Sequence, residues 1–415
     1  MNESAPHVTV IGAGIVGVCC AAWLQRSGCR VTVIDRDEPG RGASYGNAGM
    51  LQVDSCVPLG TPGIVGQVPG MLRDPLGPLA IRWGYLPRLA PWLVRLIAAS
   101  RPGRVEEISK ALAVLLGRAA AAYRDLILGT AAEDLIRPTG TIFVYSTAAG
   151  FEAARFAHDL RRRRGIRIEE LHDGEIRQLE PALSPAFKRA VFSPDCMQIA
   201  DPLVLTQRLA EAFVRAGGTI LRETVTDVTI GPGGPSHVVT DAGVHNVDRL
   251  VLAAGAWSRR LAGRLGARVP LDTERGYHLM LPKPGVELRM PIIAGDRKIG
   301  ITPMLGGIRL AGTVEFGGLE RAPDYRRARI LAGIAREVIP DLETDGADEW
   351  MGFRPSMPDS LPVIGPSPRY NNAFFAFGHG HSGLTLGAVT GNLIADLVMG
   401  RAPPIDLGPY RADRF

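Results

Sequence analysis

Three glycines near the start of the chain stand at the spacing that binds the phosphates of a dinucleotide. Gly12, Gly14 and Gly17 follow a β-branched run at residues 7–11 and open a helical pattern. The first allows a tight turn, the second lets the backbone approach a pyrophosphate, and the third packs the helix on the strand. Asp35 closes the next β-branched run, where a carboxylate binds the ribose hydroxyls of an adenosine. The pattern predicts a dinucleotide site and leaves FAD and NAD both open.

A second glycine-rich cluster lies near the other end of the chain. Residues 378–385 contain three glycines and two histidines, His379 and His381, ahead of a helical pattern at residues 384–399. Glycines let the backbone come close to a planar ring, and the positive end of the helix points at the same place. A reduced flavin is negative along N1 and the C2 carbonyl, so this end would stabilise it. The alternative is a glycine-rich N-cap on a buried helix, which gives the two histidines no role.

Two further segments extend the pattern, a small-residue loop at 42–49 and the sequence Gly352-Phe353-Arg354-Pro355. With these residues the chain resembles the D-amino-acid dehydrogenase family of the FAD-dependent D-amino-acid oxidase superfamily. The resemblance runs nearly end to end, through Gly140-Thr141 and Arg275-Gly276-Tyr277. In that superfamily a comparable loop lies along the diphosphate and flavin, whereas NAD enzymes usually enter a helix here, so the resemblance favours FAD. A plain glycine-rich connection is the other interpretation of the loop.

The resemblance implies oxidative deamination of a D-amino acid, with a D-proline or hydroxyproline type among the candidate substrates. A hydride passes from the α-carbon to flavin N5 once the amine is neutral, so no base for the α-proton is expected, and the imine hydrolyses to a keto acid. A glycine or sarcosine type amine oxidase and a flavin subunit of a multi-subunit dehydrogenase complex remain alternatives. An NAD-dependent dehydrogenase is a third, and it would not use the C-terminal cluster.

The resemblance also implies roles for individual residues. Arg354 binds the substrate carboxylate, unless it forms a structural salt bridge. Tyr277 covers or hydrogen-bonds the substrate, unless it is a buried strand tyrosine, and His381 is a third catalytic candidate whose backbone could matter more than its ring. FAD is expected to be non-covalent, because relatives that tether flavin use a cysteine near the C-terminal signature, and the last cysteine here is Cys196. No metal site is predicted. The residues expected to bind the cofactor are Gly12, Gly14, Ile15, Val16, Gly17, Asp35, Arg36, Ser44, Asn47, Ala48, Gly49, Val225, Ala254, Gly255, Trp257, Gly380, Gly383, Leu384 and Thr385.

The elements that must position these residues indicate an α/β fold. A βαβ unit covers residues 7–34, a helix covers 203–215, and buried strands follow at 225–230 and 249–254. Consecutive strands at 277–316 predict an antiparallel sheet that interrupts the first unit. We therefore expect a Rossmann-like FAD-binding domain interleaved with an α+β substrate domain. The FAD-binding domain is expected at 1–57, 187–262 and 350–415, and the substrate domain at 58–186 and 263–349.

Composition limits the partners. The 47 basic and 42 acidic side chains give a net charge of +5 without a dense basic block, so nucleic acid is not expected. Five cysteines without a pairing pattern, and no leader-like segment, indicate the cytoplasm. At residues 75–104 aromatic and aliphatic side chains alternate with arginines, which resembles an interfacial membrane element, although an ordinary amphipathic helix fits equally. The expected electron acceptor is a membrane quinone at the inner face of the cytoplasmic membrane, and the sequence predicts no oligomeric state.

Overall fold

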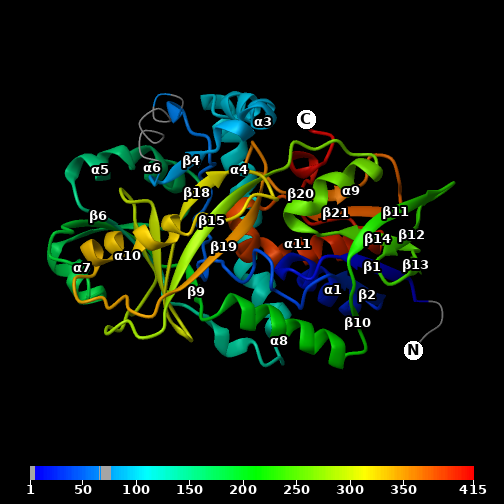
Figure 1. Ribbon diagram of the computed structural model, residues 1–415, viewed down its shortest axis with the longest axis horizontal. Helices are drawn as coiled ribbons and strands as arrows, with labels where there is room; N and C mark the ends of the chain where they lie inside the picture. The colour runs from blue at the N-terminus through cyan, green and yellow to red at the C-terminus, as the bar shows by residue number, and fades with distance from the viewer. Residues whose placement is uncertain (1–4, 65, 67–75) are drawn as a thin grey trace.

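A computed structural model describes residues 5–64, 66 and 76–415. Within these residues a six-stranded sheet has the order β10-β2-β1-β14-β21-β20. Its strands are parallel except β20, which is antiparallel to β21. This is the doubly wound arrangement that the glycine pattern predicts, and it forms the right half of the molecule in Figure 1. The strands are β1 (His7–Ile11), β2 (Arg30–Asp35), β10 (Thr219–Arg222), β14 (Arg249–Leu252), β20 (Val363–Pro366) and β21 (Ala373–Phe377).

Helices cover one face of this sheet and a small sheet covers the other. The apolar residues of both layers are buried, as a two-face α/β sheet requires. The first and last long helices touch, and a Cβ on Gly391 would come within 2.6 Å of the Cys19 backbone. Glycine is therefore needed where these helices cross. The helices are α1 (Ile15–Arg26), α4 (Pro102–Ile127), α8 (Pro202–Arg215) and α11 (Gly383–Val398), and the opposite layer holds β11 (Val225–Gly231), β12 (Gly234–Thr240), β13 (Val244–Asn246), η3 (Gly255–Trp257) and α9 (Ser258–Arg264).

A second, nine-stranded sheet forms the left half of Figure 1. Its order is β19-β15-β18-β17-β16-β6-β8-β7, with β4 also paired to β18. The consecutive strands β15, β16, β17 and β18 pair antiparallel with one another, as predicted. The whole sheet is mixed, because β16 runs parallel to β6 and β4 parallel to β18. Its strands are β4 (Leu79–Ile81), β6 (Thr141–Tyr145), β7 (Glu169–His172), β8 (Arg189–Ser193), β15 (Asp272–Leu281), β16 (Ile292–Ala294), β17 (Ile299–Met304), β18 (Gly307–Phe316) and β19 (Asp348–Ser356).

Short elements complete the second half and the junction between the halves. One core packs α7 and α10 on the nine-stranded sheet, and a smaller one packs α5 beside β6 and β8. These elements are α5 (Ala148–Ala153), α6 (Arg155–Arg163), α7 (Asp173–Leu179), α10 (Arg326–Val338), the 3-10 turns η2 (Glu133–Leu135), η4 (Gly380–Ser382) and η5 (Gly408–Tyr410), and a three-stranded sheet of β3 (Met50–Leu51), β9 (Met197–Ile199) and β5 (Ile136–Arg137).

The two predicted sets of domain ranges both contribute to the nine-stranded sheet. β8 and all but the first two residues of β19 fall within the ranges expected for the FAD-binding domain, yet both strands pair in this sheet. β19 lies at the junction, so it carries site residues toward the cavity while its backbone pairs with β15, whereas β8 lies between β6 and β7 and no residue of it lines the cavity. The proposed division of the chain stays a prediction, and its residues 1–4, 65 and 67–75 lie outside the described part.

The segment expected to contact a membrane contains β4, η1 (Trp83–Tyr85), α3 (Leu86–Ala99) and the first residues of α4. Its residue 75 lies outside the described part. Leu89 and Trp92 are buried against Phe316, while Trp83 and Val94 are 72% and 67% exposed. The helix therefore has one face packed on the protein and an apolar part turned to solvent. In the described residues, no helix combines the length and apolarity needed to cross a bilayer.

Candidate functional site

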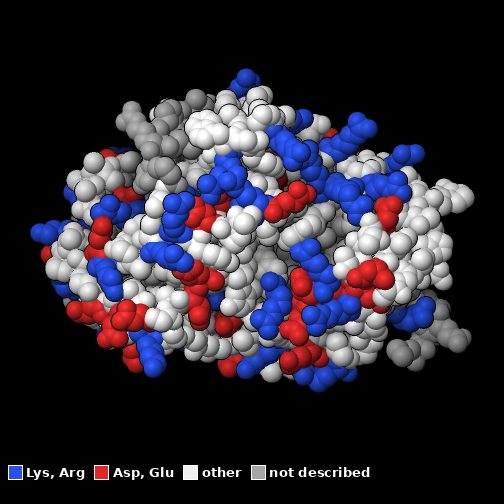
Figure 2. Space-filling model, in the orientation of Figure 1, with Lys and Arg blue, Asp and Glu red and all other residues white. Residues whose placement is uncertain are grey.

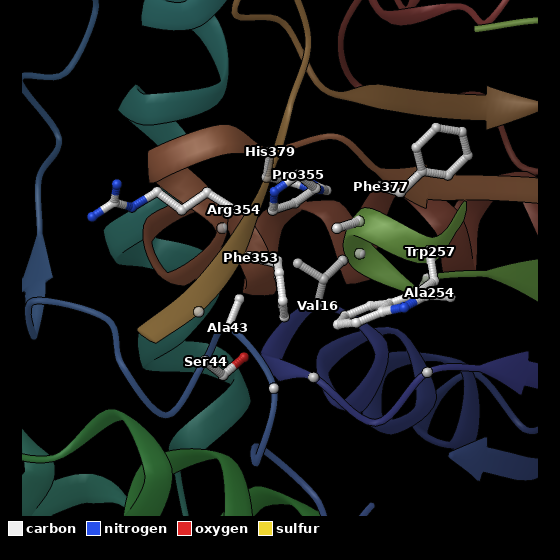
Figure 3. A pocket seen from close by; sticks show the side chains of 18 of the residues that line it. Val16, Ala43, Ser44, Ala254, Trp257, Phe353, Arg354, Pro355, Phe377 and His379 are labelled. Atoms are coloured by element: carbon white, nitrogen blue, oxygen red, sulfur yellow. The ribbon is translucent and has the colours of Figure 1, made fainter. Parts of the chain in front are cut away.

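A cavity of about 910 Å³ lies where the two sheets meet. The carboxyl ends of β1, β2 and β14 line one end of it, and β15, β19 and η4 line the other. Ligands of doubly wound sheets bind outside the carboxyl ends of the strands, so the position is the one expected of a nucleotide site. The volume is near the upper end of the usual range for small-molecule pockets. Figure 3 shows side chains from both halves converging on it.

The glycine loop forms the phosphate end of the cavity. Gly12 and Gly14 line it, whereas Gly17 does not. A Cβ on Gly17 would lie 1.9 Å from the carbonyl oxygen of Gly12, so this glycine allows the helix to pack on the strand end, as predicted. The NH of Ile15 donates to the Ser44 hydroxyl at 2.9 Å. The serine thereby fixes the small-residue loop beside the helix N-terminus, where anions are favoured.

Asp35 and an arginine–tryptophan pair lie beside the glycine loop, at the same end of the cavity. The Asp35 carboxylate accepts hydrogen bonds from the NH of Ala13 at 2.6 Å and the NH of Asp37 at 3.0 Å, and these hold it at the strand end. Each oxygen keeps a further lone pair for a hydroxyl donor. The Arg36 guanidinium lies over the Trp257 ring, 4.2 Å from its centroid. This flat, partly exposed pair suits the face of a purine ring.

The C-terminal glycine–histidine cluster lies at the start of α11, as predicted. Gly380 and Gly383 line the cavity. His379 is buried, and its Nε2 hydrogen-bonds the Thr390 hydroxyl at 3.0 Å. Burial lowers the pKa of His379 to about 3, so this ring is neutral. Its role is to hold the turn in place, and the helix N-terminus supplies the electrostatic effect.

Arg354 extends from β19 into the cavity on the side away from Phe353 (Figure 3). Its guanidinium donates to the carbonyl oxygen of Thr313 at 3.2 Å, and no carboxylate of the described residues lies within 4 Å of it. Burial lowers its pKa, but a guanidinium in a protein stays charged. A Cβ on Gly276 would lie 2.2 Å from the guanidinium carbon, so the arginine rests on a glycine of β15. The geometry thus lacks the structural salt bridge and offers a cavity-facing cation.

A buried carboxylate, Glu274, was missed by sequence reasoning. It is fully buried, and one oxygen accepts from the Ser356 hydroxyl while the other lies 2.7 Å from Nε2 of His381. Burial opposes its ionisation, but the charges and hydrogen bonds of His381, Ser356 and Arg354 outweigh burial and lower its pKa. Arg354 is the register partner of Glu274 in the pairing of β15 with β19, and the two charges attract each other without an ion-pair contact. A cation and an anion therefore stand at the same end of the cavity.

Tyr277 lies on the other side of β15. It is buried, its hydroxyl donates to Glu315 at 2.5 Å, and it accepts from the NH of Asp324. Arg275 points the same way and pairs with Glu315 at 3.3 Å. Tyr277 does not line the cavity, so its predicted contact with the substrate is not part of this geometry. The alternation Tyr277, Leu279, Leu281 of apolar residues is a sequence signal for this core-facing side.

Most of the predicted residues do line the cavity. Gly17, Gly49, Thr385 and Tyr277 do not, and the first three support its walls. Trp350, an aromatic residue of the cavity wall, was also missed; His278 stacks on it at 5.0 Å between ring centroids and Tyr45 meets it edge-on, and these two rings lie behind the wall. Those predicted residues that line it are Gly12, Gly14, Ile15, Val16, Asp35, Arg36, Ser44, Asn47, Ala48, Val225, Ala254, Gly255, Trp257, Gly380, Gly383, Leu384, Arg354 and His381.

The chain fits FAD on two structural grounds. The cavity is continuous from Asp35, past the glycine loop, to the start of α11, which matches a long dinucleotide in extended form. Loop residues 46–48 and the turn 380–383 both approach it without bulky side chains except Asn47 and His381. The carbonyls of Tyr45 and Asn47 are held by the buried Arg309 at 2.8 and 2.7 Å, which fixes this loop as one wall.

Comparison with known proteins agrees with the site. A model of the FAD dependent oxidoreductase family DAO matches residues 7–397. The chain is 40% identical over 416 residues to a D-amino-acid oxidase of Bradyrhizobium diazoefficiens, with 99% of each chain covered. It is 32% identical over 421 residues to a D-amino acid dehydrogenase of Paramagnetospirillum magneticum, with 98% of each covered.

Solved structures show the same fold. Glycine oxidase from Geobacillus kaustophilus superposes with a TM-score of 0.75 at 24% identity, covering 99% of this chain and 100% of that one. L-proline dehydrogenase from P. horikoshii gives a TM-score of 0.74 at 18% identity, covering 99% and 98%. With a family match over nearly its whole length and the cavity that such a cofactor needs, the chain belongs to the DAO family of FAD-dependent oxidoreductases.

Proposed function

We propose that this protein catalyses the FAD-dependent oxidative deamination of D-amino acids. The observation that carries the proposal is Arg354, a guanidinium without a carboxylate partner among the described residues that faces the cavity at its catalytic end. An amino acid always offers a carboxylate, and a planar guanidinium binds it through two parallel hydrogen bonds. The relatives named as D-amino-acid oxidase and D-amino acid dehydrogenase, which the chain matches over nearly its full length, support the D configuration.

The mechanism divides between cofactor and chain. FAD, when bound, would supply the two-electron oxidant for the carbon–nitrogen bond of the substrate. Arg354 fixes the carboxylate and thereby which face of the α-carbon is presented. Trp350 forms an aromatic wall at the same end of the cavity, backed by His278 and Tyr45, and its ring shields this end from water. Burial lowers the pKa of His278 to about 3, so this wall carries no histidine charge.

We also propose that the cofactor is held without a covalent bond, by the cavity-lining residues named above, with Asp35 at the ribose. All five cysteines are buried, and none of them lines the cavity. Burial raises the pKa of Cys196, which keeps this thiol protonated and unreactive. Acid precipitation should leave intact FAD in the supernatant, and colour that stays with the precipitate would contradict this proposal.

The test of activity is anaerobic flavin bleaching by a panel of amino acids. The panel contains D- and L-enantiomers, glycine, sarcosine, and D-proline with its hydroxylated form, the last two representing the cyclic substrates that we propose as candidates. Bleaching by D- but not L-amino acids supports the proposal. Bleaching by glycine and sarcosine alone would favour the amine oxidase alternative, and bleaching only after a partner protein is added would favour the subunit alternative.

We further propose a membrane quinone as electron acceptor, with contact through η1 and α3 at the inner face of the cytoplasmic membrane. Exposed Trp83, Val94 and Ile97 support this, together with a groove of about 310 Å³ beside α3 lined by Arg88, Arg95, Arg259 and Arg268. Basic side chains gather over α9 beside α3 in the upper right of Figure 2. Such a surface suits an anionic bilayer.

Vesicle sedimentation tests the membrane proposal. The protein should sediment with phosphatidylglycerol vesicles and less with phosphatidylcholine vesicles, and Trp83→Ser should weaken the first. Arg222→Gln is the control, because this exposed arginine lies on β10, at the far side of the molecule from α3 in Figure 1. Rapid turnover with oxygen by protein that binds neither vesicle would contradict both the contact and the quinone.

A further inference from the structure

We propose that His381, oriented by Glu274, accepts the proton that an amino-acid substrate loses from its ammonium group before oxidation. The inference rests on the proposed function. At neutral pH a free amino acid is a zwitterion whose nitrogen has no lone pair to push a hydride from the α-carbon. Hydride transfer needs no base for the α-proton, but it does need the neutral amine, so a proton acceptor at this end of the cavity has a defined task.

The geometry leaves one ring nitrogen of His381 for this task. Nε2 lies 2.7 Å from a carboxylate oxygen of Glu274, and no described residue hydrogen-bonds to Nδ1. A hydrogen on Nε2 that is shared with the carboxylate leaves the lone pair on Nδ1. The side chain is 53% exposed and lines the cavity. The free nitrogen is therefore accessible to a ligand, unlike the rings of His379 and His278.

The surrounding charges suit a zwitterion. Glu274 on β15 is fully buried and holds its negative charge behind His381, while Arg354 on β19 lies directly opposite it in the strand pairing. When the carboxylate of a small amino acid binds Arg354, the ammonium group of the same molecule lies toward His381 and Glu274. Asp272, also on β15, lines the cavity but is hydrogen-bonded by the Tyr85 hydroxyl at 3.0 Å, and its pKa is raised by burial.

The proton step balances within these groups. An N–H bond of the substrate ammonium breaks, its electron pair stays on nitrogen, and a new N–H bond forms at Nδ1 of His381. The imidazolium is stabilised by the carboxylate of Glu274, as an orienting acid stabilises a histidine base in hydrolases. The exposed part of the ring then returns the proton to solvent. Glu274 acts through His381, so it is a positioning residue.

A pair of ligands that cannot be oxidised tests the proposal on the holoenzyme. 2-Aminoisobutyrate is a zwitterion without an α-hydrogen, and isobutyrate has the same skeleton without the amine. The dissociation constant of each is measured by calorimetry from pH 5 to 9. The ammonium group can pass its proton only to a neutral ring of His381. The affinity for 2-aminoisobutyrate should therefore decrease as the pH is lowered, with a slope that approaches ten-fold per pH unit, and this decrease is called the acid limb. The affinity for isobutyrate should not decrease over the same pH range.

Variants distinguish a proton acceptor from a structural residue. His381→Ala should abolish the acid limb, keep FAD and isobutyrate binding, and lower the rate of flavin reduction by roughly 10²–10⁴, with partial rescue by added imidazole. Glu274→Gln should lower the affinity for 2-aminoisobutyrate and the rate of flavin reduction but keep the affinity for isobutyrate, because the imidazolium loses its counter-charge. His245→Ala is the matched control: His245 forms the same pair with Glu223 at 2.6 Å, and it does not line the cavity.

The outcomes that contradict the proton acceptor differ from the outcome that contradicts the proposed function. A limb that persists in His381→Ala, identical profiles for the two ligands, no binding of 2-aminoisobutyrate by the wild type, or loss of FAD from His381→Ala would each overturn the proposal. Absence of flavin bleaching by every D-amino acid, with the limb still present for 2-aminoisobutyrate, would refute the proposed function and support the proton acceptor.

Discussion

Replacing Arg354 by Ala should remove the substrate carboxylate site and spare the cofactor. The guanidinium is held by one hydrogen bond to the carbonyl of Thr313 and has no carboxylate within 4 Å in the described chain, although the charge of Glu274 acts on it from farther away, so a bound carboxylate would be its direct ion-pair partner. Removing one partner of a buried, hydrogen-bonded charge pair costs about 2–5 kcal/mol. At about 1.4 kcal/mol per decade this predicts a loss of roughly 30-fold to several thousand-fold in kcat/KM on the best D-amino acid.

The assay is steady-state dye reduction, with FAD content and thermal unfolding measured on the same preparations. Arg354→Lys should recover only part of the loss, because an ammonium cannot form the two parallel hydrogen bonds of a guanidinium. Arg222→Ala, at an exposed position, is the control and should keep wild-type efficiency. Near-normal efficiency of Arg354→Ala would place the carboxylate elsewhere, and loss of FAD or of folding would make Arg354 structural.

Three further variants test other parts of the site. Asp35→Ala should weaken FAD binding by about 1.5–3 kcal/mol, the range for hydrogen bonds to charged groups, in a fluorescence titration of the apoprotein, and an unchanged affinity would show that the carboxylate does not hold the ribose. Gly276→Ala should raise KM while FAD content and melting temperature stay close to wild type, because the new Cβ displaces only the flexible end of Arg354, and an unchanged KM would count against the proposed substrate position. Gly391→Ala should cost about 1–3 kcal/mol in urea unfolding, because its Cβ meets the rigid backbone of Cys19, and full stability would mean that the two helices can separate without loss.

Local sequence patterns were sufficient to predict the nucleotide-binding half of the site. The strand, glycine turn, helix and acid that form it lie within residues 7–35, and β1, α1 and β2 together span 7–35, against the 7–34 predicted for the βαβ unit. This pattern can be recognised in the sequence because the local geometry of its short segment requires each glycine. Gly12 has φ of +109°, and the backbone around Gly17 leaves no room for a Cβ. The family resemblance then indicated FAD, which the family match confirms.

The catalytic end was decided by tertiary structure, because its residues come from distant strands and the face of each strand matters. Glu274 and His381 are 107 positions apart, and only the pairing of β15 with β19 and the turn before α11 bring them together with Arg354. Side chains alternate along a strand, so Glu274 and Gly276 face this end while Arg275 and Tyr277 face the buried Glu315. The sequence by itself determined which part of the chain folds around the phosphate-binding turn of the cofactor site. The tertiary structure alone decided which side of β15 meets the substrate, since a shift of one residue reverses every side chain.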